Sequence, residues 1–180
     1  MILLMRHGED DTTRLGGWSD AGLSSLGIEQ ARLASETICR DYHISHIFSS
    51  DLPRAKETAD SIAGKLGLSV SVRKEFRETN NGDLAGISKE MFKTHYPGLY
   101  YSSLEWEQRY PNGESPKLFF ERIEDAWKMF KKEANSLPGD VLLVTHGGVI
   151  DIILCLENGI PYTNKCVLHR VSYAEIVSIS

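Results

Sequence analysis

The chain has 180 residues, enough for one ordinary α/β domain and too few for two comfortable ones. Its hydrophobic share of 41% lies in the normal globular range, which excludes a disordered or collagen-like chain. The 25 acidic side chains outnumber the 20 basic ones and no long Lys or Arg run is present, so nucleic acid is not an expected partner.

Apolar patterning also argues against a membrane or secreted protein. The longest apolar runs, such as 1–5 and 141–144, are far shorter than the roughly 20 residues that span a bilayer, and no signal-peptide pattern opens the chain. We therefore expect a cytoplasmic protein with no membrane partner. Cys39, Cys155 and Cys166 are widely spaced, and the last two lie in apolar stretches, so we expect buried thiols rather than disulfides.

The first strand and helix are separated by a polar loop. Residues 1–5 form a continuous apolar run, typical of a strand covered on both faces. After the loop over 8–23, Ser24 or Ser25 can cap a helix. Its apolar positions recur every three or four residues and predict a buried stripe of Ile28, Ala31, Ala34 and Ile38.

A second strand and helix follow directly. Residues 46–50 predict a short strand, after which Ser50 or Asp51 caps a helix with Pro53 in its first turn and Gly67 at its end. Residues 68–72 alternate and predict a third strand.

The second half continues this alternation. Ser115 begins the longest helix, 141–144 is another fully apolar strand, 149–156 is a helix, and 167–179 predicts one or two edge strands. We therefore expect an α/β three-layer sandwich, a mainly parallel sheet with helices on both faces, whose sites lie beyond the carboxyl ends of the strands.

Two buried strands each run directly into a histidine followed by glycine. If these strands are neighbours, His7 and His146 meet at one sheet edge, and Arg54 reaches the same edge from the first turn of its helix. Arg6 and backbone N–H groups near Gly147 add positive potential, and guanidinium matches phosphate oxygens. A lone histidine at a strand end is usually a core residue, but two in the same context predict a phosphate site.

These residues resemble the histidine phosphatase superfamily, also called phosphoglycerate mutase-like. The resemblance covers five ordered segments between residues 6 and 148: Arg6-His7-Gly8-Glu9, Leu23-Ser24-Ser25-Leu26-Gly27 with Gln30-Ala31, Ser49-Ser50-Asp51-Leu52-Pro53-Arg54-Ala55 with Glu57-Thr58-Ala59, Gly113-Glu114-Ser115, and Thr145-His146-Gly147-Gly148. It implies a single histidine phosphatase domain over 1–180 with a variable cap segment at about 84–112.

The resemblance also implies the roles of the site residues. His7 attacks phosphorus as a neutral nucleophile and forms a phosphohistidine, while Arg6, Arg54 and His146 hold the phosphoryl oxygens, with Gly147 beside them. Arg6 and Arg54 should lower the pKa of His7, and a hydrogen bond from its ring to a carbonyl should fix the nucleophilic tautomer. No metal and no other cofactor is expected.

In the family, the general acid lies four residues before a glycine. The resemblance therefore assigns this role to Glu78, with Glu75 as the runner-up. A glutamate in such a loop is otherwise a solvated carboxylate.

Two features depart from the family. Thr13 stands where the family often places a substrate-binding Asn, and segment 82–86 lacks the family's Trp and Glu.

The expected function is a phosphomonoester phosphatase acting on a small phosphorylated metabolite. The alternatives are a phosphoglycerate mutase, whose branch tends to be longer, and a non-catalytic module that binds a phosphorylated ligand. We expect the cap aromatics to pack on themselves. The remaining histidines are expected to be surface or packing residues: His43, His46, His95 and His169.

Overall fold

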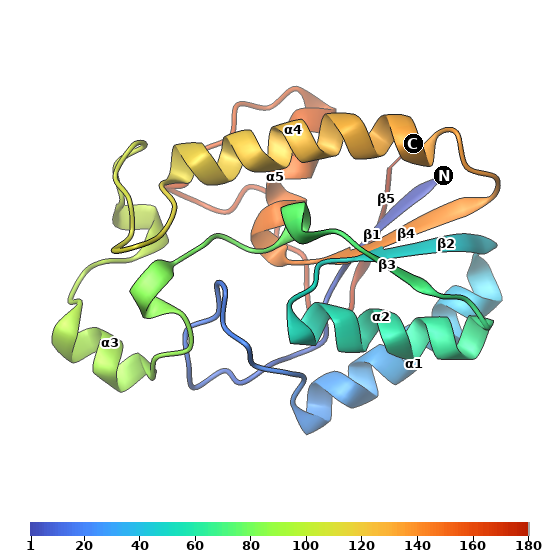
Figure 1. Ribbon diagram of the computed structural model, residues 1–180, viewed down its shortest axis with the longest axis horizontal. Coiled ribbons are helices and arrows are strands. Elements are labelled where there is room, and N and C mark those ends of the chain that lie inside the picture. The colour runs from blue at the N-terminus through green and yellow to red at the C-terminus, as the bar shows by residue number, and fades with distance from the viewer. Residues whose placement is uncertain (180) are drawn as a thin grey trace.

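A five-stranded sheet in the order β3-β2-β4-β1-β5 lies at the centre of the molecule (Figure 1). The computed structural model describes residues 1–179. The strands are β1 (Ile2–Arg6), β2 (Ile44–Ser49), β3 (Val70–Val72), β4 (Asp140–Thr145) and β5 (Ile176–Ile179). All neighbouring pairs are parallel except β1 with β5, which is antiparallel. The predicted fold class is confirmed.

Two helices cover each face of the sheet, as Figure 1 shows. Helices α1 (Ser25–Asp41) and α2 (Pro53–Leu66) pack on the face that contains Leu3 and Met5. Helices α4 (Pro116–Ala134) and α5 (Gly147–Asn158) pack on the opposite face, with Ile2 and Leu4. Because successive side chains of a strand point to opposite faces and both faces are covered, β1 and β4 are apolar throughout 2–5 and 141–144.

The pairing of β1 with β4 fixes the position of the site. In the parallel register Arg6 lies opposite Thr145, so the next residues, His7 and His146, leave the sheet at the same level. The loop over 8–23 and the cap segment lie together beyond this end of the strands (Figure 1). Backbone hydrogen bonds join this loop to the cap segment, for example the bond from Leu15 N to Ile87 O.

The cap segment contains helix α3 (Lys89–His95) and a 3₁₀ turn over Tyr101–Ser103. It has its own small apolar cluster, and Phe92 lies edge-on to Tyr100, which confirms that the cap aromatics pack on one another. No helix within residues 1–179 combines the length and hydropathy needed to cross a membrane.

Several local predictions were wrong. Ile28 is 60% exposed, because the buried stripe of α1 runs through Gly27 and Ala31 instead. Neither Ser50 nor Asp51 caps α2, whose N-cap is Leu52 without a side-chain hydrogen bond.

The C-terminal stretch agrees with expectation, whereas two of the three thiols do not. Residues 167–179 contribute one edge strand, β5, and the chain before it is irregular. Cys155 is buried as expected, but Cys39 and Cys166 are exposed, because Cys166 lies in the loop after α5 rather than in a core element.

Candidate active site

The two histidines predicted to meet do so. His7 and His146 follow the neighbouring strands β1 and β4, and their ring centroids are 5.0 Å apart in an edge-to-face arrangement. Both side chains are buried, and His7 alone of the pair lines a cavity.

Hydrogen bonding fixes the tautomer of His7. Its Nδ1 lies 2.6 Å from Gly8 O, which can only accept, so Nδ1 carries the ring hydrogen. The lone pair is therefore on Nε2, which accepts a 3.3 Å hydrogen bond from Arg54 Nε. Burial, then the charge of Arg54 and finally that of Arg6, hold the pKa of His7 well below its usual 6.5. The ring is neutral near pH 7.

Arg54 reaches His7 because it occupies the first turn of α2, directly beyond β2. Its guanidinium is almost fully buried and donates to the carbonyls of Gly17 and Ser19, both in the loop after β1. The Asp10 carboxylate lies 3.4 Å from Arg54 Nε and balances part of its charge. These contacts fix the guanidinium beside the ring of His7.

Arg6 lies on the other side of the histidine pair. Its Nη1 donates to Val171 O at 2.8 Å, and its guanidinium carbon lies 3.9 Å from the ring centroid of Tyr173. The Tyr173 ring is 5.7 Å from that of His7. Arg6 Nε is buried and has no hydrogen-bond partner within residues 1–179.

His146 is fully buried behind His7. Its Nε2 lies 2.9 Å from Ser50 Oγ, and that oxygen also accepts the N–H of Leu52. The Ser50 hydroxyl proton can therefore go to Nε2, which leaves the ring hydrogen of His146 on Nδ1. That Nδ1 has no partner in the described part of the chain. Burial, with the charge of Arg54 next, holds the pKa of His146 well below 6.5.

Glu78 faces the histidines from the polar stretch after β3. Its carboxylate accepts the N–H of Gly148 at 3.1 Å, in the first turn of α5. A Cβ on Gly148 would lie 2.5 Å from Glu78 Oε1, so a larger residue there would displace the Glu78 carboxylate. The runner-up Glu75 lies elsewhere, on the groove beside Arg73 and α4.

Two cavities meet at this site, and both are lined by Arg6, His7 and Glu78. The larger, of about 340 Å³, continues past Gly147 to the loop after α5. The smaller, of about 250 Å³, continues to the loop after β1 and to Arg54. A small molecule can therefore reach His7 from solvent.

Thr13 is the predicted site residue that lies apart from the others, because it lines neither cavity and, unlike His146, does not lie against His7. Its side chain is exposed and its hydroxyl donates to Asp11 at 2.6 Å. The neighbouring Thr12 lines the smaller cavity instead.

Sequence reasoning missed three residues that touch the site, namely Asp10, Ser50 and Tyr173. Ser50 lies within a quoted motif and Asp10 directly follows another, and their place just beyond a strand end is the available signal. Tyr173 comes from a stretch expected to be strand and is positioned by the loop before β5.

The family model of the histidine phosphatase superfamily (branch 1) matches residues 2–180. The chain belongs to this superfamily. Among its relatives in the histidine phosphatase superfamily, an Arabidopsis thaliana protein named phosphoglycerate mutase-like protein 4 is 34% identical over 157 residues, 83% of this chain and 67% of that protein. A probable phosphoglycerate mutase GpmB of Yersinia pestis is 32% identical over 97% of this chain and 85% of its own.

Solved structures of the superfamily have the same fold. A mycobacterial glucosyl-3-phosphoglycerate phosphatase superposes with a TM-score of 0.78 at 28% identity, covering 97% of this chain and 87% of its own. An alpha-ribazole phosphatase from Shigella flexneri superposes with a TM-score of 0.81 at 25% identity, covering 97% of this chain and 87% of its own.

Proposed function

We propose that this protein hydrolyses phosphate monoesters of small metabolites through a phosphohistidine formed on His7. The observation that carries the proposal is a neutral imidazole whose Nε2 lone pair lies beside the Arg54 guanidinium, at an accessible cavity that Arg6 also lines. A neutral ring is a nucleophile, and the cations attract the phosphoryl dianion toward it.

In the first step Nε2 of His7 attacks phosphorus and the bond from phosphorus to the ester oxygen breaks. Glu78, in its protonated form, gives its proton to the departing alkoxide. Its position on the same two cavities as His7 supports this role over that of Glu75.

The phosphoryl oxygens are held by Arg6, Arg54 and His146. Arg6 Nε and His146 Nδ1 are buried with no hydrogen-bond partner within residues 1–179, and an unpaired buried donor costs about 1–3 kcal/mol. Phosphoryl oxygens would accept from both. Donors fixed in advance stabilise the charge that is spread over these oxygens in the transition state.

In the second step water attacks the phosphorus of phosphohistidine and the nitrogen–phosphorus bond breaks. The Glu78 carboxylate takes a proton from this water and so returns to its starting form, and His7 regains its lone pair. The products are the alcohol and inorganic phosphate.

Phosphoglycerate mutase activity is the second candidate, because two relatives more than 30% identical are named for it. In a mutase the phosphohistidine returns its phosphoryl group to the substrate rather than to water. Exclusion of water from the intermediate would therefore decide between the two reactions.

One assay separates these reactions. The purified protein is incubated in EDTA with p-nitrophenyl phosphate, and separately with 3-phosphoglycerate with and without 2,3-bisphosphoglycerate. We expect release of inorganic phosphate. Isomerised phosphoglycerate without free phosphate would instead establish the mutase, and neither product would establish a binding module.

The nucleophile is tested with His7→Ala and with His95→Ala, an exposed histidine on α3, as the matched control. Denaturation during turnover of radiolabelled substrate should trap an acid-labile, alkali-stable phosphoprotein in the parent and in His95→Ala. Neither phosphoprotein nor turnover is expected in His7→Ala. Full activity in that variant would refute the mechanism.

A further inference from the structure

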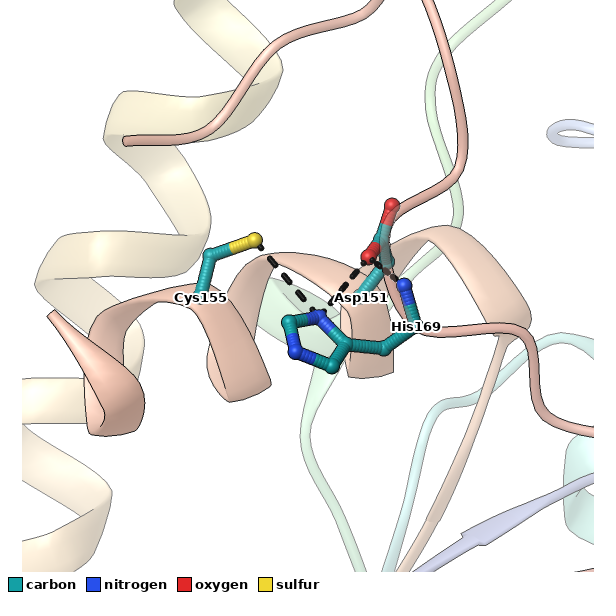
Figure 2. Close-up of side chains that lie close together, drawn as sticks. All are labelled: Asp151, Cys155 and His169. Atoms are coloured by element: carbon teal, nitrogen blue, oxygen red, sulfur yellow. Dashed lines mark hydrogen bonds and ion pairs between the residues drawn. The ribbon is translucent and has the colours of Figure 1, made fainter. Parts of the chain in front are cut away.

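Three potential metal ligands that the phosphate chemistry does not use converge beside the larger cavity at His7. Asp151 and Cys155 lie one turn apart on α5, and His169 comes from the loop that follows it; Figure 2 shows the three side chains pointing toward one another. We call them the Asp151–Cys155–His169 cluster. Its carboxylate, thiol and ring-nitrogen atoms all lie within 4.8 Å of one another.

We propose that the Asp151–Cys155–His169 cluster binds a thiophilic divalent cation of the Zn²⁺ class. Cysteine, histidine and aspartate are the residue types that ligate Zn²⁺, and three protein ligands with one open position are a recurring Zn²⁺ arrangement. The proposed metal site borders the larger cavity at His7 but uses none of the residues assigned to the phosphate chemistry.

The distances fit a tetrahedral ion. With Zn–S near 2.3 Å and Zn–N and Zn–O near 2.0–2.1 Å, tetrahedral angles place sulfur and nitrogen about 3.5 Å apart and nitrogen and oxygen about 3.3 Å apart. In the structure Cys155 Sγ lies 3.7 Å from His169 Nδ1, and that nitrogen lies 3.2 Å from Asp151 Oδ1. The remaining pair, the Cys155 sulfur and an Asp151 carboxylate oxygen, lies within 4.8 Å, so a small side-chain movement would complete the tetrahedral set.

The surroundings hold the ligands in place. Asp151 and Cys155 are buried, with 4% and 1% of their surface exposed. The Asp151 carboxylate accepts the N–H groups of Leu168 and His169, which fixes the loop that carries the histidine. A carboxylate has about four acceptor positions, so these bonds leave lone pairs for a metal.

An ion has a route to the cluster. Asp151 and His169 line the larger of the two cavities at His7, and Asp151 also lines a neighbouring one with Cys166. The fourth coordination position is therefore available to water or to another donor.

Metal binding should release the thiol proton, because the thiolate is the form of cysteine that ligates a metal ion.

The test uses the full chain with Cys39→Ser and Cys166→Ser, because Cys155 is then its only thiol. We titrate it with Co²⁺ and follow the absorption spectrum. We expect one equivalent to produce a thiolate-to-cobalt charge-transfer band and the intense visible bands of tetrahedral Co²⁺, and Zn²⁺ to displace it.

Two variants in this background are compared. His169→Gln should weaken binding by at least about tenfold, and Cys155→Ala should abolish the charge-transfer band. His95→Gln, which removes an exposed histidine from α3, is the matched control and should leave the titration unchanged.

Circular dichroism establishes that each variant is folded. A parent protein that gives no charge-transfer band at about millimolar Co²⁺, or a band that His169→Gln does not weaken, would overturn the proposal. The spectra do not depend on phosphatase activity, so the two proposals fail separately.

Discussion

At the scale of single residues, the backbone of Gly8 controls the nucleophile. The carbonyl of Gly8 accepts from His7 Nδ1, while the N–H of the same residue donates to Thr58 Oγ1 at 3.0 Å. Thr58 is fully buried on α2 and in turn donates to Arg54 O at 2.7 Å. The tautomer of His7 and the position of Arg54 therefore depend on the same hydroxyl.

Thr58→Val removes this hydroxyl with little change of volume. The N–H of Gly8 then loses its partner, so we expect the free energy of unfolding to fall by about 1–3 kcal/mol. We also expect kcat to fall more than tenfold with little change in KM, because the Gly8 peptide no longer holds the ring. Steady-state kinetics and urea unfolding measure the two effects.

Thr58→Ser is the control, since it keeps the hydroxyl and should retain most of kcat. Nitrogen NMR of the His7 ring distinguishes positioning from mere destabilisation. A Thr58→Val protein with the parent tautomer and parent kcat would show that the hydroxyl has no catalytic consequence.

The sequence predicts some of these residues and not others for a physical reason. His7 and His146 end apolar strands, and local patterning detects such positions. The contact of Tyr173 with Arg6, and that of Ser50 with His146, join residues far apart in the chain, and no local period marks them. Glu78 was identified only through the family resemblance, because its own surroundings are those of an ordinary loop.

At the scale of elements, helix α1 is docked on the chain that leaves β1. A Cβ on Gly27 would lie 2.0 Å from Glu9 O, and a Cβ on Gly8 would lie 2.5 Å from Gly27 O. The Ser24 hydroxyl caps α1 by accepting Gly27 N–H, and it donates to the Glu9 carboxylate. This contact fixes where the chain goes directly after His7.

Gly27→Ala should therefore destabilise the protein although alanine favours helix. The new methyl meets backbone, which cannot move aside easily, so we expect a loss of about 1–3 kcal/mol in the free energy of unfolding. Gly64→Ala on α2 is the matched control, because a Cβ there meets nothing within 4 Å. Helix propensity alone should stabilise that variant by about 0.5–1 kcal/mol.

Urea unfolding of both variants tests this explanation. If both variants were stabilised equally, the backbone of Glu9 would move away from the new Cβ on α1 without loss of free energy of unfolding, and the explanation would be wrong.

The strands and helices with a strong hydrophobic pattern were predicted well, and the residues at which helices begin were predicted less well. Strands β1 and β4 and helix α4 were predicted because burial imposes their patterns. The start of α2 was not, because Ser50 binds His146 and Asp51 accepts from Arg77 at 2.6 Å, so neither side chain is free to cap. Tertiary contacts outweighed the local capping preference.

At the scale of the whole molecule, the site makes folding depend on pH. His7 and His146 are both buried and have pKa values well below 6.5 when folded. As pH falls below 6.5, the unfolded chain takes up protons at these positions and the folded protein does not. Stability contributed by the neutral rings is thus complete above pH 6.5 and is lost as pH falls below it.

We expect the free energy of unfolding to fall by about 3 kcal/mol between pH 7.5 and 5.5, because both rings take up protons in the unfolded chain over this window and not in the folded protein. Urea unfolding at several pH values measures this decrease. The pH window lies above the range in which Asp and Glu titrate in an unfolded chain, which keeps carboxylates out of the comparison.

His146→Gln removes one of the two titrating rings and should remove about half of this pH dependence, whatever it does to stability at pH 7.5. The double variant with His7→Gln should remove nearly all of it. If the pH dependence stayed the same in both variants, the histidines would have to bind protons equally in the folded and unfolded states. A folded His7 that accepts a proton so readily would be cationic near its usual pKa, and it would then lack the lone pair that the proposed attack on phosphorus requires.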